Sequence, residues 1–126
     1  MSFSNYLETE ILDHVFGGAA YTAPSTLYVA LYTATPNDAG GGTELSGSGY
    51  TRKSAAFTTS GATTSNSGAI EYPTATGNWG TITHIGVFDA ATSGNLMAYG
   101  ALSSSKAVDT GDVFRIPAGD LDITLN

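Results

Sequence analysis

The sequence predicts a mainly β protein: a jelly-roll-like antiparallel β-sandwich of about eight strands, with one N-terminal α-helix. Three observations carry this prediction. The chain has 16 Gly and many uncharged polar residues, yet it is 41% hydrophobic, which is too apolar for a disordered linker. Its apolar residues recur with helical spacing near the N-terminus and alternate, as in a strand, after Pro24. From there on, turn signals recur about every 8–12 residues, as they do in sandwiches and jelly rolls.

An amphipathic helix of about a dozen residues is predicted within residues 1–18. Its apolar stripe recurs at every fourth position: Phe3, Leu7, Ile11 and Val15. Asn5, followed three residues later by Glu8, indicates a capping box, with Ser4 as a competing N-cap. A helix this short is unstable alone, so we expect its stripe to pack on the sandwich or on a neighbouring subunit.

Eight strands are expected after the helix, at residues 26–33, 50–58, 68–72, 81–88, 95–102, 104–108, 112–116 and 120–125. Both faces of the first strand are apolar, so we expect both to be covered, one of them by the helix. Residues 34–49 form the longest irregular stretch and are expected to be a long mobile loop. The length of the chain fits one domain over residues 1–126.

Composition excludes several classes of function. The chain has no Cys, which removes disulfide scaffolds and thiolate metal sites. A net charge of −7 with four basic residues argues against nucleic-acid binding. We expect no membrane span and no signal peptide, and therefore synthesis in a cytoplasm. Arg52 and Lys53 form the one pair of adjacent basic residues. Because neighbouring residues of a strand point to opposite faces, we expect one of the two side chains to form a salt bridge with an acidic neighbour.

The residues that catalysis requires are scarce. His14 lies on the helix and His84 lies within a strand, and both are expected to be structural. The pairs Asp109 with Asp112 and Asp120 with Asp122 have oxygen ligands suitable for calcium, but Asp is also common in turns. We expect no enzyme activity, no metal and no cofactor.

Trp79 is the most suggestive aromatic residue, because it lies in a turn-rich stretch between two strands. It either fills one end of the core, which we favour, or is exposed and stacks on a sugar ring. The seven Tyr residues and the low charge also suit a protein–protein interface.

Five stretches carry a resemblance to known proteins: 27–36, 49–52 (Gly-Tyr-Thr-Arg), 70–76, 79–89 and 119–124. They resemble a family of small structural proteins of tailed bacteriophages whose members are often labelled tail fibre proteins. Similar small jelly-roll proteins serve as capsid cement or decoration. The resemblance implies a structural role in the virion after synthesis in the bacterial host, and it carries over no catalytic residue.

The main hypothesis is a capsid cement protein, bound to the outer surface of the shell of major capsid protein and associated with itself as a dimer or trimer. The interface candidates are the helix stripe and two tyrosines of the first strand: Phe3, Leu7, Ile11, Val15, Tyr28 and Tyr32. The alternative is a tail-tip or tail-fibre module that attaches to a host glycan, with Trp79 and the 34–49 loop as the candidate contacts.

Overall fold

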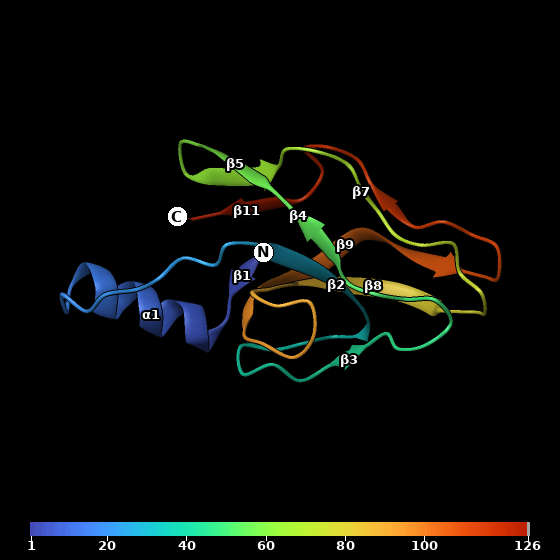
Figure 1. The fold of residues 1–126 in the computed structure, drawn as a ribbon, viewed down its shortest axis with the longest axis horizontal. Coiled ribbons are helices and arrows are strands. Elements are labelled where there is room, and N and C mark those ends of the chain that lie inside the picture. Colours follow the sequence, from blue (N-terminus) through green and yellow to red (C-terminus); the bar gives the residue numbers. More distant parts are fainter. Residues whose placement is uncertain (126) are drawn as a thin grey trace.

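The computed structural model describes residues 1–125, which form antiparallel β-sheets and one α-helix (Figure 1). The largest sheet has the order β1 (Ser2–Phe3), β9 (Leu96–Val108), β8 (Gly80–Phe88), β2 (Leu27–Ala34), β3 (Thr43–Glu44), and β4 (Lys53–Ala55) also pairs with β2. Two smaller sheets lie across from it: β11 (Asp122–Thr124), β6 (Thr63–Asn66) and β5 (Phe57–Ser60) form one, and β10 (Arg115–Ile116) and β7 (Ile70–Glu71) form the other. This confirms the predicted mainly β, antiparallel sandwich with one helix.

The main core lies between the large sheet and the two smaller ones. Strand alternation turns Val29 and Leu31 of β2 into it, and both are fully buried. Its other buried members come from β7, β8, β9, β10 and the segments between them: Ile70, Tyr72, Ala75, Trp79, Ile82, Ile85, Val87, Val108, Phe114, Ile116 and Leu121. The turn-rich segments supply the largest of these side chains, which is why short strands suffice to enclose a core.

The opposite face of β2 is also covered, as its apolar pattern predicts. Ala30 and Tyr32 are buried there against Phe88 and Leu96. The helix, which we expected to cover one face of β2, makes its main contacts with β9 and β1. On this face the guanidinium of Arg52 lies over the Phe88 ring, 3.7 Å from its centroid.

Side chains complete the edge of β2 where no strand pairs with it. β4 pairs with β2 as far as Val29, and β3 pairs with it from Tyr32 onward. Between them, the Tyr50 hydroxyl accepts a hydrogen bond from the Leu31 N–H at 3.1 Å, and the Tyr72 hydroxyl donates one to the Val29 carbonyl at 2.7 Å. Backbone groups that would otherwise be buried without partners are therefore satisfied.

The strand boundaries differ from the predicted ones in three respects. Residues 95–102 and 104–108 form the single strand β9, because a bulge between the pairs Ile82–Lys106 and His84–Ala101 absorbs the irregular stretch. Residues 50–58 divide between β4 and β5. Strands β1, β3 and β6 were not predicted, since two are only two residues long and β6 is Thr-Thr-Ser-Asn, without apolar alternation.

The predicted loop at 34–49 is fastened to the sheet at several points. β3 lies within it, the Leu45 N–H donates to the Leu31 carbonyl at 3.0 Å, and Pro36 is fully buried. Its glycine run, Gly40–Gly42, adopts positive φ angles beside a tight turn in which Asn37 and Gly40 exchange backbone hydrogen bonds. The stretch therefore forms an ordered border of the large sheet.

The N-cap of the helix α1 (Asn5–Val15) is Ser4, not Asn5 as the capping-box pattern favoured. The Ser4 hydroxyl accepts a hydrogen bond from the Leu7 N–H at 3.2 Å and donates one to the Leu96 carbonyl. The Ser4 N–H also donates to the Met97 carbonyl at 2.8 Å. The helix is thus attached to β9 at its first turn, and its body projects from one end of the sandwich (Figure 1).

Candidate binding surfaces

The projecting end of α1 exposes a group of large apolar side chains. Leu12 is 57% exposed, Val15 61% and Phe16 81%, and no residue of the helix is fully buried. Helical spacing places Leu12 next to Val15 and Phe16, one turn further on, and next to Glu8, one turn before it. We call Leu12, Val15 and Phe16 the helix tip.

An apolar groove lies beside the base of the same helix. It has a volume of about 370 Å³, and no charged side chain lines it. Its walls come from the start of the chain, the segment after the helix, the inner face of the large sheet and the β5–β6–β11 sheet. The side chains that matter below are Phe3, Leu7, Tyr21, Leu27, Ile123 and Leu125. Leu125, at the rim, is 55% exposed.

The predicted interface residues divide between these features and the core. Phe3 and Leu7 line the groove, Ile11 is half-buried on the helix, and Val15 belongs to the helix tip. Tyr28 is half-buried opposite Phe88 in the β2–β8 register. Tyr32 is only 3% exposed, so it packs within the chain and is not available as an interface residue.

Trp79 is not an exposed platform for a sugar ring. It is 5% exposed, and its ring meets that of Tyr50 edge-on at a centroid distance of 5.7 Å. Its indole N–H donates to the Ser48 carbonyl at 2.8 Å. Tyr50 stacks in turn on Tyr72, with centroids 6.3 Å apart. Trp79 thus occupies the end of the core, as the favoured interpretation of the sequence had it.

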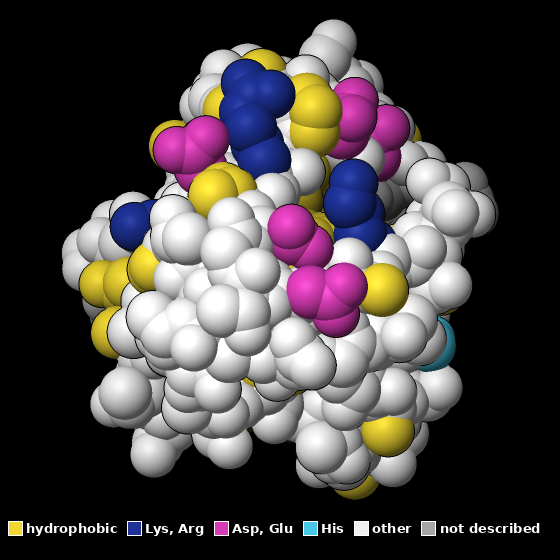
Figure 2. Space-filling view, turned by 90° about the vertical axis from the view of Figure 1, so that its right-hand side faces the viewer, with side chains coloured by type: hydrophobic (Ala, Val, Ile, Leu, Met, Phe, Trp, Pro, Cys, Tyr) yellow, Lys and Arg dark blue, Asp and Glu magenta, His cyan; other side chains and the backbone are white. Residues whose placement is uncertain are grey.

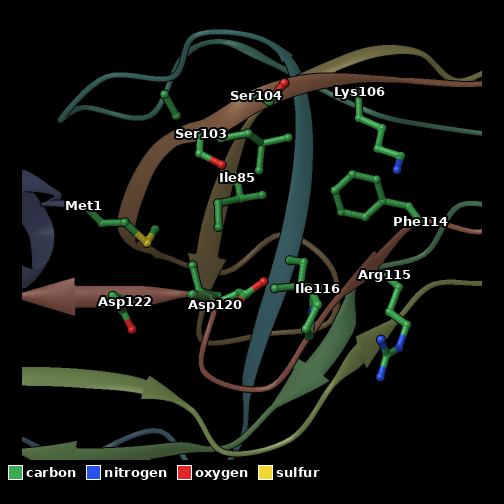
Figure 3. A pocket seen from close by; sticks show the side chains of 14 residues that line it. Met1, Ile85, Ser103, Ser104, Lys106, Phe114, Arg115, Ile116, Asp120 and Asp122 are labelled. Atoms are coloured by element: carbon green, nitrogen blue, oxygen red, sulfur yellow. The ribbon is translucent and has the colours of Figure 1, made fainter.

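A second depression has a volume of about 420 Å³, and charged and hydroxyl side chains line it together with apolar ones (Figure 3). One wall is β9, including its bulge, with Ser103, Ser104 and Lys106; the other is the segment from Phe114 to Asp122. Lys106, Arg115 and Asp120 are exposed, and none of the three forms an ion pair within residues 1–125. We call this depression the polar cleft.

The polar cleft combines hydrogen-bond donors and acceptors in a small space. Lys106 and Arg115 donate only, Asp120 accepts, and the hydroxyls of Ser103 and Ser104 do both. The molecular end where β7 and the end of β9 lie likewise mixes basic and acidic side chains, with no block of one sign (Figure 2). Such a surface suits a ligand rich in hydroxyl groups better than a polyanion.

Sequence reasoning did not find this cleft. Its residues come from two segments that the turn at Asp109–Asp112 and the strand β10 bring together. The sequence did contain one signal. All residues of the run Ser103-Ser-Ser-Lys106 are polar, whereas a strand with one face on the core normally alternates polar and apolar residues.

Arg52 forms the structural ion pair that its position in a basic pair predicted. Its guanidinium donates twice to the Glu44 carboxylate at 2.8 Å, and to the carbonyls of Ala90 and Ser93 at 3.0 and 2.8 Å. Tyr50 donates to the same carboxylate at 2.7 Å. Because each of the three guanidinium nitrogens donates to a protein acceptor, this cluster holds segments together.

The remaining candidates for chemistry are separate from one another. A ring nitrogen of His84 hydrogen-bonds the neighbouring Thr83 hydroxyl, and one of His14 bonds the Ala19 carbonyl. Asp109 and Asp112, like Pro117 and Asp120, close tight turns through backbone hydrogen bonds. Among residues 1–125, no three His, Asp or Glu side chains come together as metal ligands, and no helix has the length and apolarity needed to cross a membrane.

The chain matches a model of a known family. The family model described as Podophage GP4 fiber I protein gp80 matches residues 2–124, a range that includes the helix, every strand described above, and the lining of the groove and the polar cleft apart from Leu125 and Met1. A search of curated proteins finds no match.

Proposed function

The chain belongs to the podophage GP4 fiber I protein gp80 family, and from this premise we propose that it is a fibre component that helps the phage attach to its host. A structural role in the bacteriophage virion follows from the membership itself. The family description supports the tail-fibre alternative better than the capsid-cement hypothesis, which nothing in it favours. The observation that carries the proposal is the extent of the match, residues 2–124.

We propose that the chain acts by binding and not by catalysis. Its two histidines bond neighbouring groups in the chain, and the ion pair of Arg52 with Glu44 is held by further hydrogen bonds from Arg52 and Tyr50 to protein groups. The polar cleft is the surface best suited to a host ligand. Sugar hydroxyls both donate and accept hydrogen bonds, which matches Lys106, Asp120 and the serines of β9. A surface glycan of the host is therefore the proposed ligand class, with the cleft in place of Trp79 as its contact.

The first test concerns the location of the protein in the particle. We expect a quantified gel of purified virions to give a few to a few dozen copies per particle, as a tail or fibre requires. Hundreds of copies would overturn the fibre proposal and support the capsid-cement hypothesis, in which the protein binds the major capsid protein.

The second test concerns attachment through the cleft. Purified protein added to host cells is expected to compete with phage adsorption, and Lys106→Gln and Arg115→Gln are each expected to compete at least about tenfold less well. Lys53→Gln is the charge-matched control, because Lys53 lies on β4 outside the cleft. If the wild type does not compete, host attachment is overturned. If all three variants compete like the wild type, attachment stands and the cleft is not its site.

A further inference from the structure

We infer that a pocket on the face of the large sheet opposite the main core is a second binding site of this chain, and that its ligand is an uncharged sugar residue. The pocket has a volume of about 500 Å³, a size typical of ligand clefts. It shares no lining residue with the polar cleft, so the inference stands apart from the proposed host attachment through that cleft. We call it the outer pocket.

The outer pocket forms where three segments that are far apart in the sequence meet over the large sheet. Its floor belongs to the smaller buried cluster on this face: Tyr32, Phe88 and Leu96. Its walls come from the start of α1, from residues 38–41 and from residues 94–95. The Asn5 N–H donates to the Asp38 carbonyl at 2.9 Å, so a backbone hydrogen bond joins two of these walls.

The Tyr32 hydroxyl is the observation that carries the inference. Tyr32 is 3% exposed, and its hydroxyl bonds no group of residues 1–125, whereas those of Tyr50, Tyr72 and Tyr99 each bond a protein group. Within those residues no side-chain oxygen is both sealed from solvent and without a partner. The hydroxyl therefore lies in the small exposed part of Tyr32, which opens into the outer pocket. A polar group held this deep is suited to bond a ligand that enters.

Gly86 explains how the Tyr32 ring comes to lie there. A Cβ at Gly86 would lie 2.9 Å from Cε1 of Tyr32 and 3.0 Å from Cδ1 of Leu96. The missing side chain therefore lets the ring lie closely over β8, as glycines within strands often do for a neighbouring group. Packing against Phe88 and Leu96 then holds the ring, and with it the hydroxyl, in one place.

The walls of the outer pocket add further hydrogen-bonding groups. The Asp38 carboxylate accepts a bond from the Tyr99 hydroxyl through one oxygen, which leaves the other oxygen as an acceptor. The Asn95 amide donates to Asp89 at 2.9 Å, which leaves its carbonyl oxygen as an acceptor. The exposed side chain of Asn5 both donates and accepts.

This combination favours an uncharged sugar over other ligand classes. No Lys or Arg lines the outer pocket and Asp38 does, so a phosphate or an acidic sugar finds no opposite charge there. A sugar hydroxyl donates and accepts at once, which matches the Tyr32 hydroxyl and the Asp38 carboxylate. The apolar C–H groups of a sugar ring suit a floor that contains Phe88. Residues 38–41 belong to the 34–49 stretch, so part of the sequence-predicted glycan contact lies in this pocket.

The test is an NMR titration of the purified chain, followed through its backbone amide signals. The probes are D-glucose, D-galactose, L-rhamnose and N-acetyl-D-glucosamine. We expect at least one of them to bind with a roughly millimolar dissociation constant and to shift the amides of Ala39, Gly41 and Asn95. The amides of Ser103 and Ser104, in the polar cleft, should not move. The absence of shifts with all four sugars, or shifts confined to the polar cleft, would overturn the inference.

Tyr32→Phe isolates the contribution of the hydroxyl. The variant keeps the ring and loses no bond within the described chain, so its midpoint in urea should equal that of the wild type, while it binds the same sugar about tenfold less tightly. Tyr28→Phe is the matched control, because Tyr28 lies on the same strand but does not line the outer pocket, and it should bind like the wild type. Equal binding by Tyr32→Phe and the wild type would overturn the inference.

D-Glucosamine tests the ligand class, because its amine carries a positive charge that N-acetyl-D-glucosamine lacks. We expect the charged sugar to bind no more than about threefold more tightly than its uncharged counterpart. If D-glucosamine alone shifted the amides of the outer pocket, the site would be a cation site at Asp38, and the assignment of an uncharged sugar would be wrong.

Discussion

At the scale of single residues, Arg52 connects more of the chain than any other polar side chain described here. Its side chain is 7% exposed and reaches Glu44 at the border of the sheet, the carbonyls of Ala90 and Ser93, and the ring of Phe88. A lysine has neither the planar fork for a bidentate contact nor enough donors in the right directions.

Arg52→Lys is therefore expected to lower the free energy of unfolding by about 2 kcal/mol, less than for a fully buried pair because Glu44 is 26% exposed. Urea denaturation measures the change. Lys53→Arg, at the neighbouring position on β4, should leave the midpoint unchanged. An Arg52→Lys variant as stable as the wild type would show that the packing over Phe88, and not the ion pair, holds the segments.

Two buried tyrosines, Tyr32 and Tyr72, and the half-buried Tyr50 predict a loss of stability at alkaline pH. Burial raises the pKa of Tyr32 to about 12, and burial also raises the pKa of Tyr50 and Tyr72 above the ordinary value. In the unfolded chain these phenols ionise near pH 10. The folded state holds protons that the unfolded state releases, so the stabilisation is complete below about pH 10 and is lost as the pH rises through 12 for Tyr32.

Thermal unfolding between pH 8 and about pH 11 tests this expectation. The midpoint should be flat below about pH 10 and then fall, and Tyr72→Phe should reduce the slope of the fall although it lowers the midpoint at pH 8, because the bond to the Val29 carbonyl is lost. An equally steep fall in the Tyr72→Phe variant would show that this phenol does not contribute to it.

At the scale of elements, the start of α1 depends on a contact from the far end of the chain. Ser4 caps the helix and also donates to the carbonyl of Leu96, which begins β9. Ser4→Ala is expected to cost about 1–2 kcal/mol of stability, because the cap and a buried bond disappear together. Asn5→Ala is the matched control, since Asn5 is exposed and its side chain makes no hydrogen bond in the structure. Chemical denaturation of both variants decides which residue is the cap, and a larger loss for Asn5→Ala would contradict the structure.

The same helix marks the limit of what local sequence reveals. Periodicity predicts the length of α1 correctly, because the spacing of apolar residues is a local signal. Ser4 and Asn5 are equivalent as local caps, and a bond to a residue 92 positions away selects between them. Strand β2 is predicted well because alternation is complete over its length, whereas β6 has no apolar pattern and becomes a strand only through its partners β5 and β11.

For the candidate surfaces too, local sequence patterns predict some features, and contacts between distant residues determine the others. The apolar stripe of the helix was predictable, and the structure adds that its last turn is left uncovered. The polar cleft was not predictable, because the bulge that presents Ser103 and Ser104 depends on the register between β8 and β9. Trp79 could be placed only when its partner Tyr50 and the Ser48 carbonyl were known.

At the scale of the whole molecule, the two depressions adjoin along β11. Asp122 lines the polar cleft, and the next residue, Ile123, lines the apolar groove. A virion that carries several copies of the chain presents several polar clefts. Linked binding sites bind a surface of repeated glycans more strongly than a single site does, because the second contact forms at a high effective concentration.

Several linked clefts should consequently strengthen host attachment without changing the affinity of one cleft. Virions are expected to compete with the adsorption of labelled phage at a cleft concentration at least about tenfold lower than that of the purified protein. Calorimetry measures the affinity of the purified protein for a short saccharide prepared from the host surface. Arg115→Gln should lose this affinity, and Phe16→Ser, on the helix tip, should keep it. A Phe16→Ser variant that loses the short saccharide would show that the helix tip contacts the host directly, and equal competition by virions and purified protein would show that one cleft is enough for attachment.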